Sequence, residues 1–364
     1  MMKDTRFYAL DGLRGIFALT VLLNHAIQSV TGWKNDGPFS GPHLSVAYFF
    51  IISGFVLTHS HGKNDGFVKY LLTRFARLWP LTFISVVAMV LTYAILNFSG
   101  DGYVPGDYVF NANLIIKNIL FIHGATPFKF HLINPPTWTI GIEFWASLFI
   151  PLVFVRMDAI LRLCSSIALF ILLFYVSKTG MEKLDSLLLF GMHNLLFAIA
   201  SMMLGSSIYS VLERKSDKIS NNSKHIEVFM WTSFATCMIG IYAQTSFVNR
   251  LDFFFIISFA PILMVDYLSE NSFIKKFTRC EIVQFFGYIS FPLYLLHFPI
   301  LITGIAYRGS DNVWLGVLMM CSVSIVVAYL YTAFVDVRMY RYLKGCINAL
   351  LPDKPPTVEK NKEA

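Results

Sequence analysis

Long apolar stretches separated by short polar connections dominate the chain. A run of about 20 apolar residues is long enough to cross a bilayer as an α-helix. The pattern predicts spans at about 12–31, 43–59, 78–98, 137–156, 159–177, 186–212, 226–244, 249–268, 282–305 and 313–335. We therefore expect an all-α integral membrane protein with about ten transmembrane helices.

The composition supports this class. Hydrophobic residues make up 56% of the chain and charged residues 14%, with a mean hydropathy of +0.60. A soluble domain of this size does not carry that balance. The first apolar segment is of full length and lacks a small-residue cleavage site, so we expect it to be retained as an anchor.

Lysine and arginine residues predict the orientation of the spans. With the N-terminus inside, the inner connections hold 21 of the 29 Lys and Arg residues and the outer connections hold seven. Basic residues concentrate on the cytoplasmic side of membrane proteins, so both termini are predicted to be cytoplasmic. The net charge of +7 thus reflects topology, and we expect no nucleic-acid partner.

The pattern predicts one membrane domain over residues 1–335 and a short cytoplasmic tail over 336–364. The tail is charged and, from Pro352, rich in proline, which predicts disorder. The longest outer connection, 99–136, contains the apolar run Leu114–Ile122. That run is too short to span a bilayer, so an interfacial or re-entrant helix is expected.

Cysteine usage predicts neither a disulfide nor a metal site. No cysteine lies in a Cys-x-x-Cys or mixed Cys/His ligand pattern. All are assigned to spans or to the cytoplasmic side, where disulfides are rare. The five residues are Cys164, Cys237, Cys280, Cys321 and Cys346.

Ionisable residues inside apolar spans are costly in lipid and usually functional. Arg14 and His25 share the first span and lie eleven positions apart. On a helix this separation is about 16 Å along the axis with an angular offset of about 20°. One face of the first helix therefore presents a cation near one surface and a titratable base near mid-membrane.

Three further ionisable residues stand out in later spans. Glu143 lies near the outer end of its span and needs a cationic or hydrogen-bonding partner. His297 is predicted at about the same depth as His25, and it serves either as a supporting or substrate-contacting residue or in the chemistry itself. A single histidine in a span more often joins two helices by a hydrogen bond, which is how we interpret His193.

Arg74 and Arg77 are spaced i, i+3 at the cytoplasmic start of the third span, so on a helix they project together. The positive-inside rule by itself would also account for two basic residues before a span. Paired guanidinium groups bind phosphate oxygens with directional hydrogen bonds. With Arg14 near the same surface, the three arginines favour an anionic cytoplasmic ligand.

Five motifs recur in an order typical of one known family. They are Leu10-Asp11-Gly-Leu-Arg14-Gly with His25 eleven residues after Arg14, Phe49-Phe-Ile-Ile-Ser53-Gly-Phe55, Arg74-x-x-Arg77-Leu-x-Pro80, Trp138-Thr-Ile-Gly-Ile-Glu143-Phe-Trp and Tyr294-Leu-Leu-His297. In this order and topology the chain resembles the family 3 membrane acyltransferases, which O-acylate bacterial surface polysaccharides and related molecules.

The resemblance implies a ten-helix bundle around a pore in the bacterial cytoplasmic (inner) membrane. It implies acetyl-CoA or another acyl-CoA as the donor, with no metal, and a lipid-linked or surface glycan such as O-antigen as the acceptor. His25 and Glu143 are the implied catalytic candidates. The implied donor-binding residues are Arg14, Arg74 and Arg77, and the supporting or substrate-contacting residues are Asp11, Ser53, Trp138, Tyr294 and His297.

The chain departs from the family pattern in two places. Some members carry a C-terminal extracytoplasmic esterase-like domain, and here we expect transfer to the acceptor without one. The fourth span reads Thr139-Ile-Gly-Ile-Glu143 where many members have a more polar Ser-Leu-x-x-Glu. Hydroxyl groups beside Glu143 are therefore expected to contribute less.

The resulting hypothesis is that His25 removes a proton from an acceptor hydroxyl, which attacks the thioester while Glu143 orients or stabilises the imidazole. Ser53, Tyr294 and His297 are the candidate oxyanion donors, and an acyl intermediate on His25 is the alternative route. The alternative hypotheses are that the protein is a polytopic transporter, a scaffold subunit for polysaccharide assembly, or an enzyme that acylates a small hydroxylated metabolite.

Overall fold

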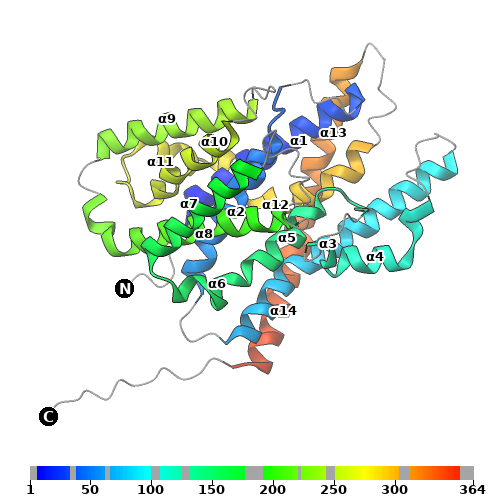
Figure 1. Ribbon diagram of the computed structural model, residues 1–364. Coiled ribbons are helices and arrows are strands. Elements are labelled where there is room, and N and C mark those ends of the chain that lie inside the picture. The colour runs from blue at the N-terminus through cyan, green and yellow to red at the C-terminus, as the bar shows by residue number, and fades with distance from the viewer. Residues whose placement is uncertain are drawn as a thin grey trace.

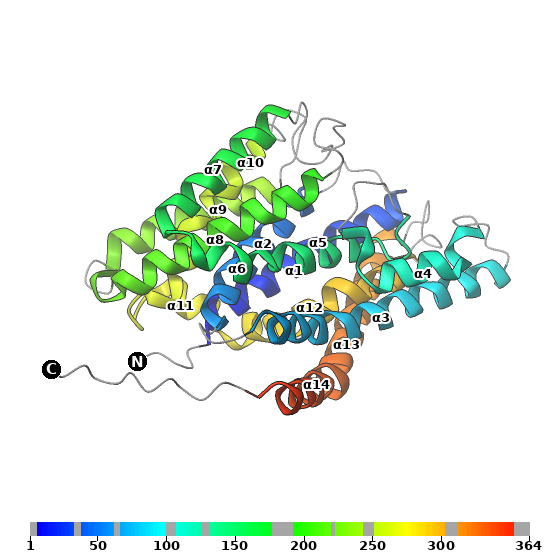
Figure 2. The ribbon, with the colours of Figure 1, turned by 60° about the horizontal axis from the view of Figure 1, so that its bottom comes forward.

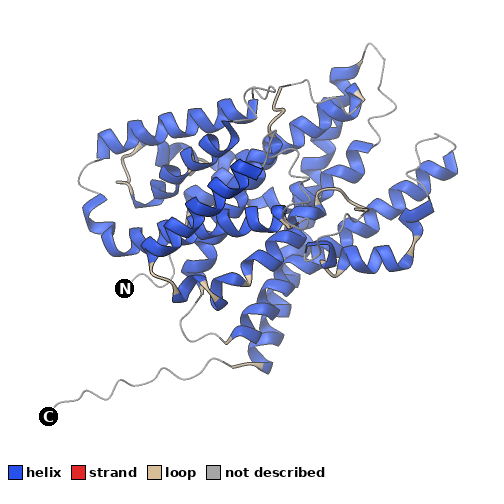
Figure 3. Cartoon of the chain, viewed as in Figure 1, coloured by secondary structure: helices blue, strands red, loops and turns tan. Residues whose placement is uncertain are grey.

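The structure is a computed structural model. It describes residues 6–32, 38–61, 66–99, 107–124, 131–176, 192–219, 223–242, 251–302 and 312–352. Within these ranges every regular element is a helix (Figure 3). The predicted all-α class is therefore confirmed.

The helices follow the predicted order along the chain. Their bounds are α1 Tyr8–Thr31, α2 Pro42–Ser60, α3 Phe67–Ser99, α4 Ala112–Ile119, α5 Thr137–Ser147, α6 Phe149–Leu152, α7 Ala159–Val176, α8 His193–Ile219, α9 Ser223–Tyr242, α10 Asp252–Ser258, α11 Phe273–Thr278, α12 Glu281–Leu301, α13 Val313–Tyr331 and α14 Val337–Leu350. Short 3₁₀ turns occur at Asp107–Phe110, Ile122–Gly124, Phe154–Arg156 and Ala260–Tyr267.

Eight helical segments in the described part of the chain are long and apolar enough to cross a membrane. Two predicted spans are not among them. The first, 226–244, forms α9, which begins with the polar residues Lys224, His225 and Glu227. The second, 249–268, is split into α10 and a 3₁₀ helix, because Pro261 lacks the amide hydrogen needed to continue an α-helix.

Helices α1 and α12 cross at very close range in the middle of the molecule (Figures 1 and 2). Glycines make this crossing possible. A Cβ atom on Gly15 would collide with the backbone of Gly287, and one on Gly287 would collide with the carbonyl of Asp11. The close approach places the first turns of α1, including Arg14, beside the polar start of α12.

The segment before α5 is anchored to α12 at a backbone carbonyl that a proline leaves without its usual hydrogen-bond donor. Pro299 has no amide hydrogen to donate to the carbonyl of Leu295, four residues earlier. The buried side chain of Asn134 donates from Nδ2 to that carbonyl instead, at 2.9 Å. The hydrogen bond fixes the outer segment next to the turn of α12 that carries His297.

Helix α4 occupies most of the run Leu114–Ile122, and its eight residues are too few to span a bilayer, as predicted.

The expected disorder from residue 336 is wrong for 337–350, which form α14. This helix continues from α13 through a π-helical segment, Thr332–Asp336, and packs against α3. Residues from 353 onward lie outside the described ranges.

Candidate active site

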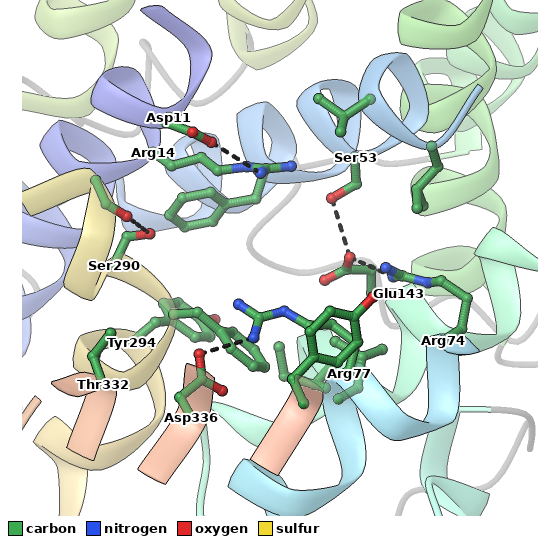
Figure 4. Close-up of a pocket in the computed structure, with 18 of the residues that line it drawn as sticks. Asp11, Arg14, Ser53, Arg74, Arg77, Glu143, Ser290, Tyr294, Thr332 and Asp336 are labelled. Carbon is green, nitrogen blue, oxygen red and sulfur yellow. Dashed lines mark hydrogen bonds and ion pairs between the residues drawn. The ribbon is translucent and has the colours of Figure 1, made fainter. Parts of the chain in front are cut away.

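A cavity of about 1000 Å³ lies between α1, α2, α3, α5, α12 and α14. Seven of the residues singled out from the sequence line it (Figure 4). They are Asp11, Arg14, Ser53, Arg74, Arg77, Glu143 and Tyr294. Six basic and three acidic side chains line the cavity in all, so it carries a surplus of positive charge and suits an anionic ligand.

Glu143 is held by groups from two other helices. Its Oε1 accepts hydrogen bonds from Arg74 Nη2 at 2.8 Å and from Ser53 Oγ at 3.1 Å (Figure 4). The side chains of Arg74 and Glu143 are only 10% and 15% exposed, so the ion pair is nearly buried. The predicted need of Glu143 for a cationic and hydrogen-bonding partner is met by this arrangement.

Arg14 projects into the cavity from α1 and shares Asp11 with Arg6. Arg6 Nε donates to Asp11 Oδ2 at 2.7 Å, whereas Arg14 Nη1 lies 3.8 Å from Asp11 Oδ1. The contact of Arg14 is therefore too long for a hydrogen bond. The guanidinium of Arg14 keeps most of its donors available for a ligand.

Arg77 connects α3 with the π-helical segment and with α14. Its Nη1 donates to Asp336 Oδ2 at 2.8 Å. The guanidinium lies 5.2 Å from the ring centre of Phe291 and 5.4 Å from that of Tyr340, which are cation–π distances. Arg74 and Arg77 thus both line the cavity, but each is already paired with a carboxylate.

Tyr294 and Phe49 also line the cavity, and their ring centres are 5.7 Å apart. The hydroxyl of Tyr294 lies 3.1 Å from Thr139 Oγ1, which joins α12 to α5. The Tyr294 ring also neighbours His297, with ring centres 6.2 Å apart. Tyr294 therefore both lines the cavity and contacts His297.

His25 and His297 form a stacked pair beyond Tyr294. His25 Nδ1 and His297 Nε2 are 2.9 Å apart, and the rings are nearly parallel, at 18°. The predicted equal depth of these residues is confirmed by their contact. His297 is fully buried, whereas His25 is partly accessible.

The backbone determines which nitrogen of His25 carries the proton. His297 Nδ1 lies 2.9 Å from the carbonyl of Leu293, and a carbonyl only accepts hydrogen bonds, so His297 Nδ1 is protonated. In the neutral ring His297 Nε2 is then an acceptor, and His25 Nδ1 donates to it. The Nε2 atom of His25 is left as the basic nitrogen.

The structure corrects the expected role of Glu143 toward His25. Among the described residues the hydrogen-bonding partner of His25 is His297, and Glu143 bonds to Arg74 and Ser53. The reason is geometric, because Arg74 projects from α3 directly at α5. His25, His297 and Trp138 do not line the cavity; Trp138 is partly buried against the main core.

The contribution of the C-terminal region to the cavity was not predicted from the sequence. Its charge and nearby prolines suggested disorder, yet α14 supplies cavity-lining residues at i, i+3, i+4, i+7, i+8 and i+11. They are Val337, Tyr340, Arg341, Lys344, Gly345 and Asn348. This helical period was visible in the sequence and was the available signal.

The fold and the cavity define a multi-pass membrane protein with a positively charged site inside its helical bundle. A family model described as an acyltransferase domain matches residues 7–333. The chain therefore belongs to the family 3 acyltransferases, and the transporter and scaffold readings are set aside.

Individual relatives are distant in sequence. The chain is 23% identical to peptidoglycan O-acetyltransferase OatA of Listeria monocytogenes, in an alignment covering 100% of this chain and 61% of OatA. It is 21% identical to the putative peptidoglycan O-acetyltransferase YrhL of Bacillus subtilis, covering 84% of this chain and 50% of YrhL. It is 27% identical to acyltransferase MdmB of Streptomyces mycarofaciens, covering 41% and 40%.

The chain thus spans one half to three fifths of the length of the two peptidoglycan O-acetyltransferases. No solved structure matches the chain. The acyltransferase assignment therefore comes from the family match, and the donor and acceptor are to be argued from the site.

Proposed function

We propose that the protein transfers an acetyl group from acetyl-CoA to a hydroxyl of a bacterial surface glycan or its lipid-linked precursor. The observation that carries the proposal is the cavity, which is positively charged and is lined by Tyr294, whose ring neighbours His297 of the His25–His297 pair. Coenzyme A combines several phosphate groups with a long, uncharged arm that ends in the thioester. That distribution of charge complements a cavity lined both by six basic side chains and by the aromatic rings of Phe49 and Tyr294.

In this proposal the donor enters from the cytoplasmic side. Its phosphates interact with the guanidinium groups near the entrance, and the pantetheine arm extends toward Ser53, Glu143 and Tyr294. Arginine forms short, directional hydrogen bonds to phosphate oxygens. Because Arg74 and Arg77 are already paired with Glu143 and Asp336, they mainly set the electrostatic potential, and Arg14 has more donors free.

The transfer step uses the free Nε2 of His25 as the general base. It takes the proton of the acceptor hydroxyl while that oxygen forms a bond to the thioester carbonyl carbon. The carbon–sulfur bond then breaks, and the imidazolium returns the proton to the departing sulfur, giving the acetyl ester and free CoA. Tyr294 lies next to this reaction zone, and its hydroxyl is the leading candidate donor to the developing oxyanion.

The acceptor is proposed to approach from the outer side, where the segment 131–136 and α4 cover the end of α12. The names of the peptidoglycan O-acetyltransferase OatA and the putative peptidoglycan O-acetyltransferase YrhL support a glycan as the acceptor class. In a Gram-negative organism the corresponding acceptor is an O-antigen or exopolysaccharide. A small hydroxylated metabolite is the competing acceptor within the same enzyme class.

The proposal is tested by acetyl transfer in a reconstituted system. Purified protein in lipid is incubated with isotopically labelled acetyl-CoA and an extract of lipid-linked glycans. We expect label in the glycan fraction, as an ester released by mild base. Label only in the water-soluble, small-molecule fraction would overturn the glycan assignment, and no transfer from acetyl-CoA to any fraction would overturn the donor assignment.

A further inference from the structure

Helix α14 presents a basic face to the mouth of the cavity. The family match ends at residue 333, so this helix lies outside the part of the chain that the family model describes. Its cavity-lining residues share one face, since they recur with the period of an α-helix. Arg341 and Lys344 are the two cations on that face.

These two cations differ from the other basic residues of the cavity. Arg74 and Arg77 are each paired with a carboxylate at 2.8 Å and Arg6 with Asp11 at 2.7 Å, and Arg14 lies 3.8 Å from the carboxylate of Asp11. Arg341 and Lys344 form no ion pair with any residue in the described part of the chain. Both side chains are exposed, so their donors are available to a ligand entering from the cytoplasmic side.

The position of α14 is fixed by specific contacts. Arg77 bonds to Asp336, where the π-helical segment ends, and its guanidinium stacks on Tyr340 in the first turn of α14. A π turn inserts an extra residue, which rotates the following helix by about 100° relative to an uninterrupted α-helix. The rotation and the Arg77 contacts are consistent with the place of Arg341 and Lys344 among the residues that line the cavity.

We propose that the face of α14 formed by Tyr340, Arg341 and Lys344 is a binding site for the phosphate groups of the acyl donor at the cavity mouth. The inference rests on the proposed use of acyl-CoA and names which residues hold its anionic end. The pantetheine arm passes inward between α3 and α12, whereas the nucleotide stays at α14. Tyr340 provides an aromatic surface on which the adenine ring of coenzyme A can stack, because any nucleobase can stack on an aromatic side chain.

The test compares two donors that share one thioester. Acetyl-CoA carries the phosphates, and acetyl-pantetheine carries none. The KM values of both are measured for the full-length protein in nanodiscs of neutral lipid, with thiol release as the readout. Variants are Arg341→Ala, Lys344→Ala and the double variant, with Arg338→Ala as the matched control, because Arg338 is on the same helix but does not line the cavity.

We expect each single variant to raise the KM for acetyl-CoA about fivefold and the double variant about 25-fold. The KM for acetyl-pantetheine should not change, Arg338→Ala should behave as wild type, and Arg341→Lys should retain most of the affinity. Because both cations are exposed, the melting temperature of the double variant should match that of wild type.

Equal KM values in wild type and the double variant, or parallel changes for both donors, would overturn the inference and leave the proposed function intact. An effect that appears only when anionic lipid is added to the nanodiscs would overturn it in favour of lipid headgroup binding. Failure of wild type to release thiol from acetyl-CoA would instead overturn the donor assignment, and this inference with it.

Discussion

At the scale of single residues, the hydrogen bonds of the histidine pair determine its chemistry. The chain of contacts from the Leu293 carbonyl through His297 to His25 leaves one basic nitrogen, Nε2 of His25. In serine hydrolases a carboxylate holds the catalytic histidine in this way. Here a neutral imidazole replaces the carboxylate, which fixes the tautomer without adding a negative charge to the membrane interior.

In the proposed mechanism His297 is a positioning residue, and its variants should separate hydrogen bonding from packing. We expect His297→Leu to lower kcat by about 100-fold with little change in KM for acetyl-CoA, because the tautomer of His25 is no longer fixed. His297→Gln retains an acceptor for His25 Nδ1 and should keep clearly more activity. The comparison is made from full kinetic curves of thiol release; equal kcat values for the two variants would contradict the positioning role.

The Arg74–Glu143 ion pair is expected to contribute to the free energy of unfolding. Removing one partner of a nearly buried ion pair leaves an uncompensated charge, which costs about 3–5 kcal/mol. Arg74→Met and Glu143→Leu should each lower thermal stability strongly, and the double variant should be more stable than the sum of the single effects implies. Strictly additive losses of the free energy of unfolding would show that the pair is not coupled.

The sequence predicted much of the site at this scale but not its pairing. Spacing and span position identified Arg14, His25, Glu143 and His297. The partner of Glu143 depends on how α3 meets α5, and that of His25 on how α1 meets α12. The way two helices pack is not encoded in the local hydrophobic periodicity of either one. The sequence pattern therefore led to the wrong prediction that Glu143 interacts with His25.

At the scale of elements, the apolar pattern identified the membrane helices well, because lipid requires each span to satisfy its own backbone hydrogen bonds. It failed where polar residues and prolines break that rule. Residues 251–267 contain Asp252, Pro261 and Asp266, and they form two short helices instead of one span. The tail was misread because α14 is stabilised by contacts with α3, which composition does not reveal.

The glycine crossing of α1 and α12 provides a prediction for these elements. Gly287→Val introduces side-chain atoms where a Cβ would already meet the backbone of Asp11, so the helices must separate. We expect a lower melting temperature. We also expect a reduced kcat, because Arg14 and His25 both lie on α1 and move with it. Gly66→Ala is the matched control, because a Cβ there meets no atom within 4 Å. Wild-type stability of Gly287→Val would contradict the close packing.

At the scale of the whole molecule, the charge distribution predicts which side of the membrane each end of the cavity faces. The inner connections and α14 hold most of the basic residues, and the cavity opens among them. This orientation is required if a cytoplasmic donor is to reach a site that an external acceptor approaches from the opposite side.

Two native cysteines test that orientation. Cys280 and Cys346 are exposed near the predicted cytoplasmic face. A membrane-impermeant maleimide should label them in inverted vesicles and leave them unmodified in right-side-out vesicles. Cys280→Ser and Cys346→Ser variants identify the modified positions. Labelling of either residue from the outside would reverse the topology and the proposed direction of transfer.

In the proposed mechanism the cavity delivers acetyl-CoA to a general base on α1. The most direct measurement is the release of free CoA from acetyl-CoA by purified protein in lipid, with and without glycan acceptor, for wild type and His25→Ala. We predict acceptor-dependent thiol release that falls by about 100-fold or more in His25→Ala, while acetyl-CoA still protects that variant from thermal unfolding. Undiminished thiol release by His25→Ala would contradict the assignment of His25 as the general base.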